Sequence, residues 1–261
     1  MIPISDSELR RKTRPYVNIS IIVVCAVVFV YQWIMGHLDE TVFIYKYGVI
    51  PIELTQGISL GVENTDLGLL DLRTPLSDWL SIFTSMFIHG GFWHFFFNML
   101  FLWVFGDNIE DRFGHLRYLL FYLAAGFVAV WLQVATDMDS VVPIIGASGA
   151  IAGVLGAYML LYPYSRVTTL VLFFFVRIPA LALLLFWFVF QFFQGVGALL
   201  PSTEGGVAYW AHVGGFLLGV VVAVLYKVAT KQKIWPRGPG GTFHGGGGEQ
   251  PEVKYWRGRR L

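Results

Sequence analysis

Residues 145–161 read IGASGAIAGVLGAYMLL, an apolar stretch that carries one serine, Ser148, near its start. Its small residues and the Tyr162-Pro163 pair after it predict a helix from about Ala147 to residue 161. At 1.5 Å per residue this helix covers roughly 22 Å, whereas the hydrocarbon core of a bilayer is about 30 Å thick. We therefore expect Ser148 to lie below the membrane surface, where a water-filled cavity can open.

The composition places the chain in a membrane. Of 261 residues, 56% are hydrophobic and 13% are charged, with a mean hydropathy of +0.64, which a water-soluble globule does not cover with polar surface. We predict an all-α membrane protein: a bundle of six transmembrane helices (17–229) with a long first loop and a short central fourth helix, between a basic N-terminus (1–16) and a disordered, glycine-rich tail (230–261). The six predicted spans are 17–36, 91–109, 116–136, 147–161, 179–199 and 206–229.

The positive charges predict the orientation of the spans. All but two of the 18 lysines and arginines fall in segments that an even number of spans puts on one side, and only Lys46 and Arg73 fall opposite. Because cytoplasmic loops carry the excess of positive charge, we expect both termini in the cytoplasm. Cytoplasmic termini and the lack of added domains favour a multi-pass protein of the plasma membrane, with an organelle as the alternative.

Several functional classes are excluded or disfavoured by the sequence. A net charge of +1 gives no basic face for nucleic acid. The single cysteine, Cys25, cannot form an intramolecular disulfide. We expect no cofactor and no metal, because no His-Glu-x-x-His occurs and His89 and His94 face different sides of a helix. A small transporter would show inverted repeats and charge at mid-span, and neither is found.

Polar residues at membrane depth are costly and are therefore candidates for function. Ser148 opens a predicted helix, where backbone N–H groups have no intrahelical partner and can bind an anion. His212, in the sixth span, is a potential base for its hydroxyl. Glycines on both spans, Gly149 and Gly215 among them and Gly219 one turn further, would let the helices approach closely, although such glycines also mark dimer interfaces and Ser148 also suits a plain packing turn.

The second span contributes a further polar pair. His94 and Asn98 are four residues apart and share a helix face. Together with the Ser148 N–H they would make an oxyanion pocket; alone they would be read as an interhelical hydrogen-bond clamp. His89 has two readings as well, a site residue or a tie between the first loop and the second span.

Four short motifs occur in order along the predicted spans, and together they resemble the rhomboid family of intramembrane serine proteases in its bacterial form. The resemblance covers roughly residues 77–227. The motifs are His94-Phe95-Phe96-Phe97-Asn98, Glu110-Asp111-Arg112-Phe113-Gly114, Gly146-Ala147-Ser148-Gly149 and Ala211-His212-Val213-Gly214-Gly215 followed by Gly219.

The resemblance implies a Ser148–His212 dyad that cleaves single-span membrane substrates through an acyl-enzyme, with Asn98 and His94 in the oxyanion hole. It implies structural roles for Glu110 and Arg112. A catalytically silent relative that binds membrane helices is the alternative, and the oligomeric state is open.

Two positions depart from the family pattern. The first loop has Trp79-Leu80 where the family often has Trp-Arg, and Ala152 stands where some members place a tyrosine against the histidine. Another group must then hold the imidazole of His212.

Overall fold

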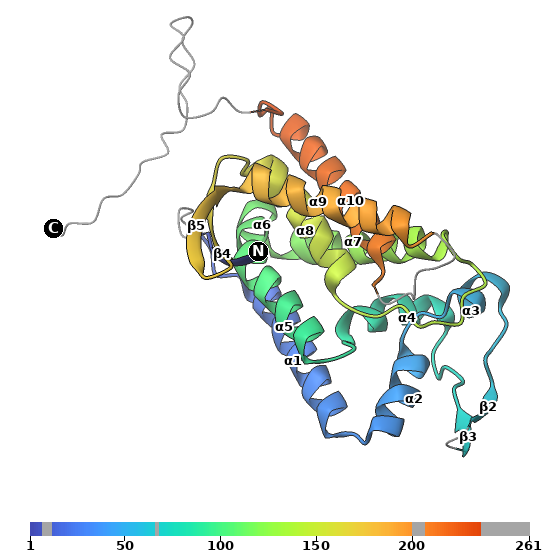
Figure 1. Ribbon diagram of the computed structural model, residues 1–261. Coiled ribbons are helices and arrows are strands. Elements are labelled where there is room, and N and C mark those ends of the chain that lie inside the picture. Colours follow the sequence, from blue (N-terminus) through green and yellow to red (C-terminus); the bar gives the residue numbers. More distant parts are fainter. Residues whose placement is uncertain (7–11, 66–67, 200–206, 236–261) are drawn as a thin grey trace, which may run out of the picture.

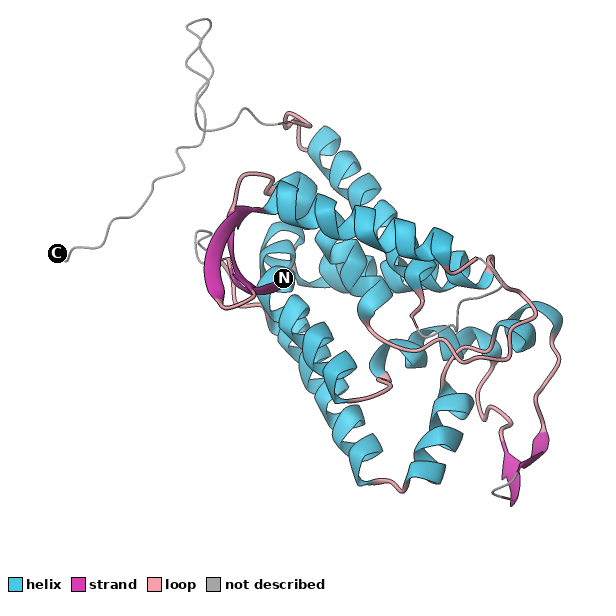
Figure 2. Ribbon diagram, viewed as in Figure 1, coloured by secondary structure: helices cyan, strands magenta, loops and turns pink. Residues whose placement is uncertain are grey.

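The computed structural model describes residues 1–6, 12–65, 68–199 and 207–235, and it is mostly helical (Figures 1 and 2). The predicted glycine-rich tail lies outside the described residues from residue 236 on. The helices are α1 (Tyr16–Ile34), α2 (His37–Tyr47), α3 (Pro51–Gln56), α4 (Asp78–Thr84), the 3₁₀ turn η1 (Ser85–Phe87), α5 (Phe92–Phe101), the π-helical turn η2 (Leu102–Gly106), α6 (Asp107–Phe113), α7 (His115–Val134), α8 (Ser148–Leu161), α9 (Ala180–Gly197) and α10 (Tyr209–Ala229).

A helix occupies each of the six predicted stretches, with ends that differ from the prediction by about one turn or less. Four of the described helices, α1, α7, α9 and α10, are long and apolar enough to cross a membrane. The continuous run 92–113, formed by α5, η2 and α6, meets α4 and η1 at an angle of 83° and makes a fifth candidate as a bent pair. The prediction of a helical membrane bundle is confirmed, with α8 as a shorter apolar helix in it.

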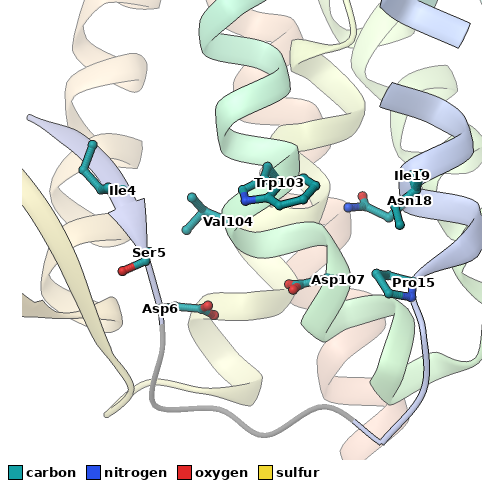
Figure 3. Close-up of a pocket in the computed structure, with 9 residues that line it drawn as sticks. All are labelled: Ile4, Ser5, Asp6, Pro15, Asn18, Ile19, Trp103, Val104 and Asp107. Carbon is teal, nitrogen blue, oxygen red and sulfur yellow. The ribbon is translucent and has the colours of Figure 1, made fainter. Parts of the chain in front are cut away.

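The described residues also contain strands, which the prediction of an all-α protein did not include. The strands β1 (Ile2–Ser5), β4 (Arg166–Val171) and β5 (Phe174–Pro179) form one antiparallel sheet in the order β1-β4-β5. The strands β2 (Val62–Thr65) and β3 (Gly68–Asp71) form a hairpin in the first loop. Figure 3 shows β1 beside the helix that carries Trp103 and Asp107, where a cavity of about 200 Å³ lies between them.

Helix α8 is the centre of the bundle, and twelve of its fourteen residues are buried. Its glycines bring it into backbone contact with α10: a Cβ on Gly215 would overlap the carbonyl oxygen of Gly149, and one on Gly219 would overlap that of Gly153. Such approach is available only to residues without a side chain. The glycines thus align α8 and α10 along their length, with Ser148 at one end.

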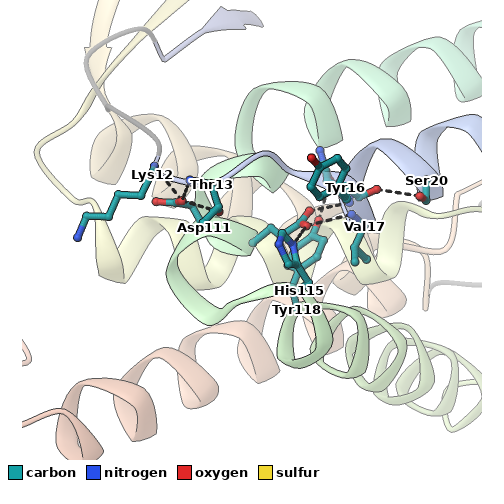
Figure 4. Close-up of polar contacts among 10 residues, drawn as sticks. Lys12, Thr13, Tyr16, Val17, Ser20, Asp111, His115 and Tyr118 are labelled. Carbon is teal, nitrogen blue, oxygen red and sulfur yellow. Dashed lines mark hydrogen bonds and ion pairs between the residues drawn. The ribbon is translucent and has the colours of Figure 1, made fainter.

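The opposite end of the bundle, which we call the Glu110 end, is held by a buried carboxylate. Glu110 accepts hydrogen bonds from the backbone N–H groups of Val17 (2.9 Å) and Asn18 (2.7 Å) and lies 2.5 Å from Nδ1 of His115. Figure 4 shows Val17 and His115 close together in this network. These two N–H groups lie in the first turn of α1, where backbone N–H groups have no acceptor within the helix. Glu110 therefore caps α1 and joins it to α6 and α7.

Arg112 and Lys227 hold α10 at the same end. The guanidinium of Arg112 donates to Gln232 over 2.5 Å and lies 5.5 Å from the ring centre of Tyr226. The buried ammonium of Lys227 donates to the carbonyl of Leu160 over 2.6 Å. A cation at the carboxyl end of a helix satisfies its free carbonyls, so Lys227 caps α8.

The first loop is folded against the segment that precedes Ser148. Val49 and Ile144 form an isolated antiparallel bridge, with N–O distances of 3.1 and 2.8 Å. The N–H of Gly146 donates to the carbonyl of Ser85 over 2.9 Å. These contacts fix the backbone segment that leads into Ser148.

Candidate active site

The side chains of Ser148 and His212 meet between α8 and α10. Oγ of Ser148 lies 2.8 Å from Nε2 of His212, a hydrogen-bond distance. Ser148 is half-buried and His212 is buried. A serine hydroxyl becomes a useful nucleophile when a neighbouring base takes its proton, and an imidazole nitrogen at this distance can act as such a base.

The backbone positions the two groups from different elements. Ser148 is the first residue of α8, so its N–H and the next two point out of the helix without intrahelical partners. His212 lies in the first turn of α10, whose start is held by Gln133 of α7: its Oε1 accepts from the N–H groups of Trp210 (3.1 Å) and Ala211 (3.3 Å). Gln133 thus fixes where α10 begins, and with it the height of the imidazole.

Two residues of α9 hold the imidazole ring in place of the tyrosine that Ala152 replaces. Oε1 of Gln191 lies 2.8 Å from Nδ1 of His212, and the ring centre of Trp187 lies 5.8 Å from that of His212. Because an amide oxygen only accepts, Nδ1 carries the proton, and Nε2 is left with a lone pair that faces Ser148.

Sequence reasoning missed Gln191, although a usable signal was present. Gln191 is a polar residue in the middle of the predicted fifth span, and such residues are functional candidates by default. Trp187 is one turn before it and shares its face. The same signal would have identified Gln133 in the third span.

His94 lies against the glycine that precedes the serine segment. A Cβ on Gly146 would lie 2.7 Å from Nε2 of His94 and 3.7 Å from Oγ of Ser148, and Gly146 has a φ of +116°, which favours glycine. The ring nitrogen Nδ1 accepts from the N–H of Gly90 over 3.3 Å. Nε2 is therefore the protonated nitrogen, and it points toward the backbone that leads into Ser148.

Asn98 lies one turn further along α5 and is buried. Its amide group donates to the carbonyl of His94 over 2.8 Å. A side-chain amide has two N–H bonds, so the second is free to donate elsewhere. The two residues share a helix face, and His94 brings that face to the start of α8.

The backbone of His89 ties the first loop to α1, and its ring packs against the site. Gln32 and His89 exchange two hydrogen bonds, at 3.0 and 3.1 Å, between the amide of Gln32 and the backbone of His89. The ring of His89 packs edge-on to His94, with centroids 5.3 Å apart. Among the described residues, no group of three histidine, cysteine, aspartate or glutamate side chains is placed to hold a metal ion.

Comparison with known proteins assigns the chain to a family. The model of the rhomboid domain matches residues 76–228, more than half of the chain, and the chain belongs to the rhomboid family. It is 31% identical over 160 residues to "Rhomboid protein 1, mitochondrial" of Saccharomyces cerevisiae, an alignment that covers 59% of this chain and 44% of the yeast protein.

Two bacterial relatives are named as proteases. The chain is 44% identical over 82 residues to "Rhomboid protease GluP" of Bacillus subtilis, which covers 31% of this chain and 16% of that protein. It is 32% identical over 104 residues to "Putative rhomboid protease YdcA" of the same organism, which covers 40% and 45%. The chain thus spans less than half the length of these relatives.

Proposed function

We propose that this protein is an intramembrane serine endopeptidase that cleaves single-span membrane proteins, with Ser148 as nucleophile and His212 as general base. The observation that carries the proposal is the 2.8 Å contact between Oγ of Ser148 and Nε2 of His212 at the start of a short, buried helix. Membership of the rhomboid family, with relatives named as proteases, supports it.

The reaction follows from the proton positions. Oγ of Ser148 attacks the scissile carbonyl carbon, and its proton passes to Nε2 of His212. The tetrahedral oxyanion is bound by the Ser148 N–H, the free amide N–H of Asn98 and Nε2–H of His94. When the intermediate collapses, His212 gives its proton to the leaving amine, and water then hydrolyses the ester by the same steps.

Gln191 contributes to this reaction through His212. Its Oε1 accepts from Nδ1–H, and it keeps the imidazole in the tautomer that can take the serine proton. The ring becomes a cation in the transition state, and an amide oxygen at that distance stabilises the cation. We therefore assign Gln191 as a positioning residue.

In the membrane, we propose six spans, with α8 as the short central one and the Glu110 end facing the cytoplasm together with both termini. The excess of lysine and arginine supports this orientation. The plasma membrane is the proposed location. In this arrangement Ser148 lies within the outer half of the bilayer, where a substrate helix reaches it laterally from lipid.

Cleavage of a single-span reporter helix in proteoliposomes tests the function. The wild-type protein is expected to cut the reporter, Ser148→Ala to have no activity, and Ser20→Ala to match the wild type, because Ser20 is exposed on α1. Undiminished turnover by Ser148→Ala would reject the proposal.

A further inference from the structure

The loop between α8 and α9 is a β-hairpin whose end is covered with exposed apolar side chains. Strands β4 and β5 pair in register from Arg166↔Pro179 to Val171↔Phe174. The exposed fractions of the four residues at the end, Leu172, Phe173, Phe174 and Phe175, are 81%, 90%, 72% and 70%. We call residues 172–175 the β4–β5 tip. A group of adjacent apolar side chains at such exposure marks a surface that contacts a partner or a membrane.

The turn itself is of a kind that normally carries glycine. Leu172 has a φ of +55°, and with Phe173 it forms the two-residue connection between the strands. A positive φ at the first position of such a turn favours glycine or asparagine. A leucine at this position keeps an apolar side chain at the very end of the hairpin, where it has no protein to pack against among the described residues.

The hairpin points back alongside the membrane helices rather than away from them. Asp6, just after β1, accepts from the Asn108 amide over 2.8 Å, level with α6. Further back along β1, Ile4 lines a cavity with Trp103, which lies one turn before Asp107 on the neighbouring helix and so further from the Glu110 end (Figure 3). Strand β1 also contacts α5, so it runs away from the Glu110 end along the bundle as it is followed back to Met1.

The pairing of β1 with β4 shows which end of the hairpin lies further from the Glu110 end. Ile2 pairs with Leu170 and Ser5 with Thr168, so the β4–β5 tip is at the deep end of the sheet. Leu172 extends two residues beyond Leu170, or about 7 Å at the rise of a strand. The tip is thus the part of the sheet furthest from the Glu110 end.

The base of the hairpin has the opposite character. Arg177 is exposed near the end of β5, and Pro179 leads directly into α9, a candidate membrane span with exposed apolar side chains such as Phe186. The tip and the exposed apolar side chains of α9 therefore both lie on the side of Pro179 that faces away from the Glu110 end, and the charged base lies nearer to that end. This change from a charged base to an apolar tip matches the change from lipid headgroups to acyl chains across a leaflet.

We propose that the β4–β5 tip inserts into the bilayer leaflet at the Glu110 end and binds lipid at the boundary between headgroups and acyl chains. The outer edge of β5 is not paired with another strand among the described residues, and unpaired backbone groups exclude a position in the middle of the hydrocarbon. Phenylalanine and leucine side chains reach the acyl chains while the backbone stays where water is available. The segment is a membrane-binding hairpin and not a cytoplasmic loop.

Depth-dependent fluorescence quenching tests this insertion without any activity readout. Phe173→Cys, in a Cys25→Ala background, is labelled with an environment-sensitive fluorophore and reconstituted into phosphatidylcholine vesicles. The matched control is Arg177→Cys at the base of the same hairpin. A nitroxide at carbon 5 of the lipid acyl chain is expected to quench the tip label several-fold more than the base label, and aqueous iodide is expected to show the reverse order.

Each other result overturns the proposal. A tip label that iodide quenches and the lipid nitroxide does not would place the hairpin in water. If neither quencher reaches the tip label, protein covers the tip. Loss of this protection in vesicles that hold one protein each would identify a second copy as the cover, and protection that persists there would identify another part of the same chain. Leu172→Cys repeats the measurement if Phe173→Cys lowers the thermal unfolding midpoint.

Discussion

The two ends of α8 are held in different ways. At the Ser148 end the helix is fixed by backbone contact with α10 and by the side-chain hydrogen bond between Ser148 and His212. At the Glu110 end it is fixed by side chains: Tyr158 donates to Asp6 over 2.6 Å and Lys227 donates to the carbonyl of Leu160 over 2.6 Å. The polar groups at one end are thus available for chemistry, and those at the other are engaged in holding the helix.

The largest effect is expected where the two helices touch. In Gly219→Leu the new side chain overlaps the carbonyl of Gly153, so α10 must move away and the dyad separates. We expect loss of activity and destabilisation by about 3 kcal/mol or more, measured by reporter cleavage and thermal unfolding in detergent. Gly197→Leu is the control, because a Cβ there meets nothing within 4 Å. Equal behaviour of the two variants would disprove the backbone contact.

The next largest effect is expected from the oxyanion donor. Asn98→Ala removes an amide N–H that we assign to the transition state, and kcat should fall about 10²- to 10³-fold. KM and the unfolding midpoint should change little, since the ground state gains little from this donor. A variant that loses stability instead of kcat would show that Asn98 serves only as an interhelical clamp.

Variants of Gln191 distinguish a role in positioning the imidazole of His212 from a role in packing α9. Gln191→Leu keeps the volume but removes the acceptor for Nδ1–H of His212, and kcat should fall about 10- to 100-fold because the wrong tautomer and orientation become populated. Gln191→Glu keeps an acceptor oxygen and should recover part of the loss. Gln194→Leu, on the exposed side of α9, is the matched control, and a kcat for Gln191→Leu equal to that of this control would remove Gln191 from the mechanism.

The smallest effect on activity is expected at the Glu110 end. Lys227→Met leaves the carbonyl of Leu160 without its cation, so the free energy of unfolding should fall by about 1–3 kcal/mol, with kcat within a factor of about two of the wild-type value. Lys231→Met, at an exposed lysine just beyond α10, should change neither. A large loss of kcat in Lys227→Met at unchanged stability would contradict the view that the Glu110 end only holds the helix in place.

The helices and the central pair were predictable from sequence because the bilayer imposes strong rules. Length and apolarity give the spans, and polar residues at depth are few enough that Ser148 and His212 stand out. The glycines at positions 215 and 219 predicted the close helix approach that brings Ser148 and His212 together. The positions of these groups therefore follow from local pattern.

The contact between Gln191 and His212 and the pairing of the sheet did not follow from local pattern, although the polarity of Gln191 at mid-span marks it as a candidate. Gln191 contacts His212 only because α9 packs beside α10, and the order of packing is a tertiary property. Strand β1 pairs with β4 across more than 160 residues, and in the apolar run 171–176 a strand cannot be told from the end of a helix by periodicity alone. Both features depend on how distant segments pack together.

The reactivity of Ser148 is measured most directly with a fluorophosphonate probe, followed by peptide mapping of the labelled protein in proteoliposomes. We predict a label on Ser148 in the wild type and slower labelling, by a factor of about 10³ or more, in His212→Ala. Labelling of Ser148 at the wild-type rate in His212→Ala, or no label on Ser148 in folded wild-type protein, would contradict a Ser148–His212 dyad.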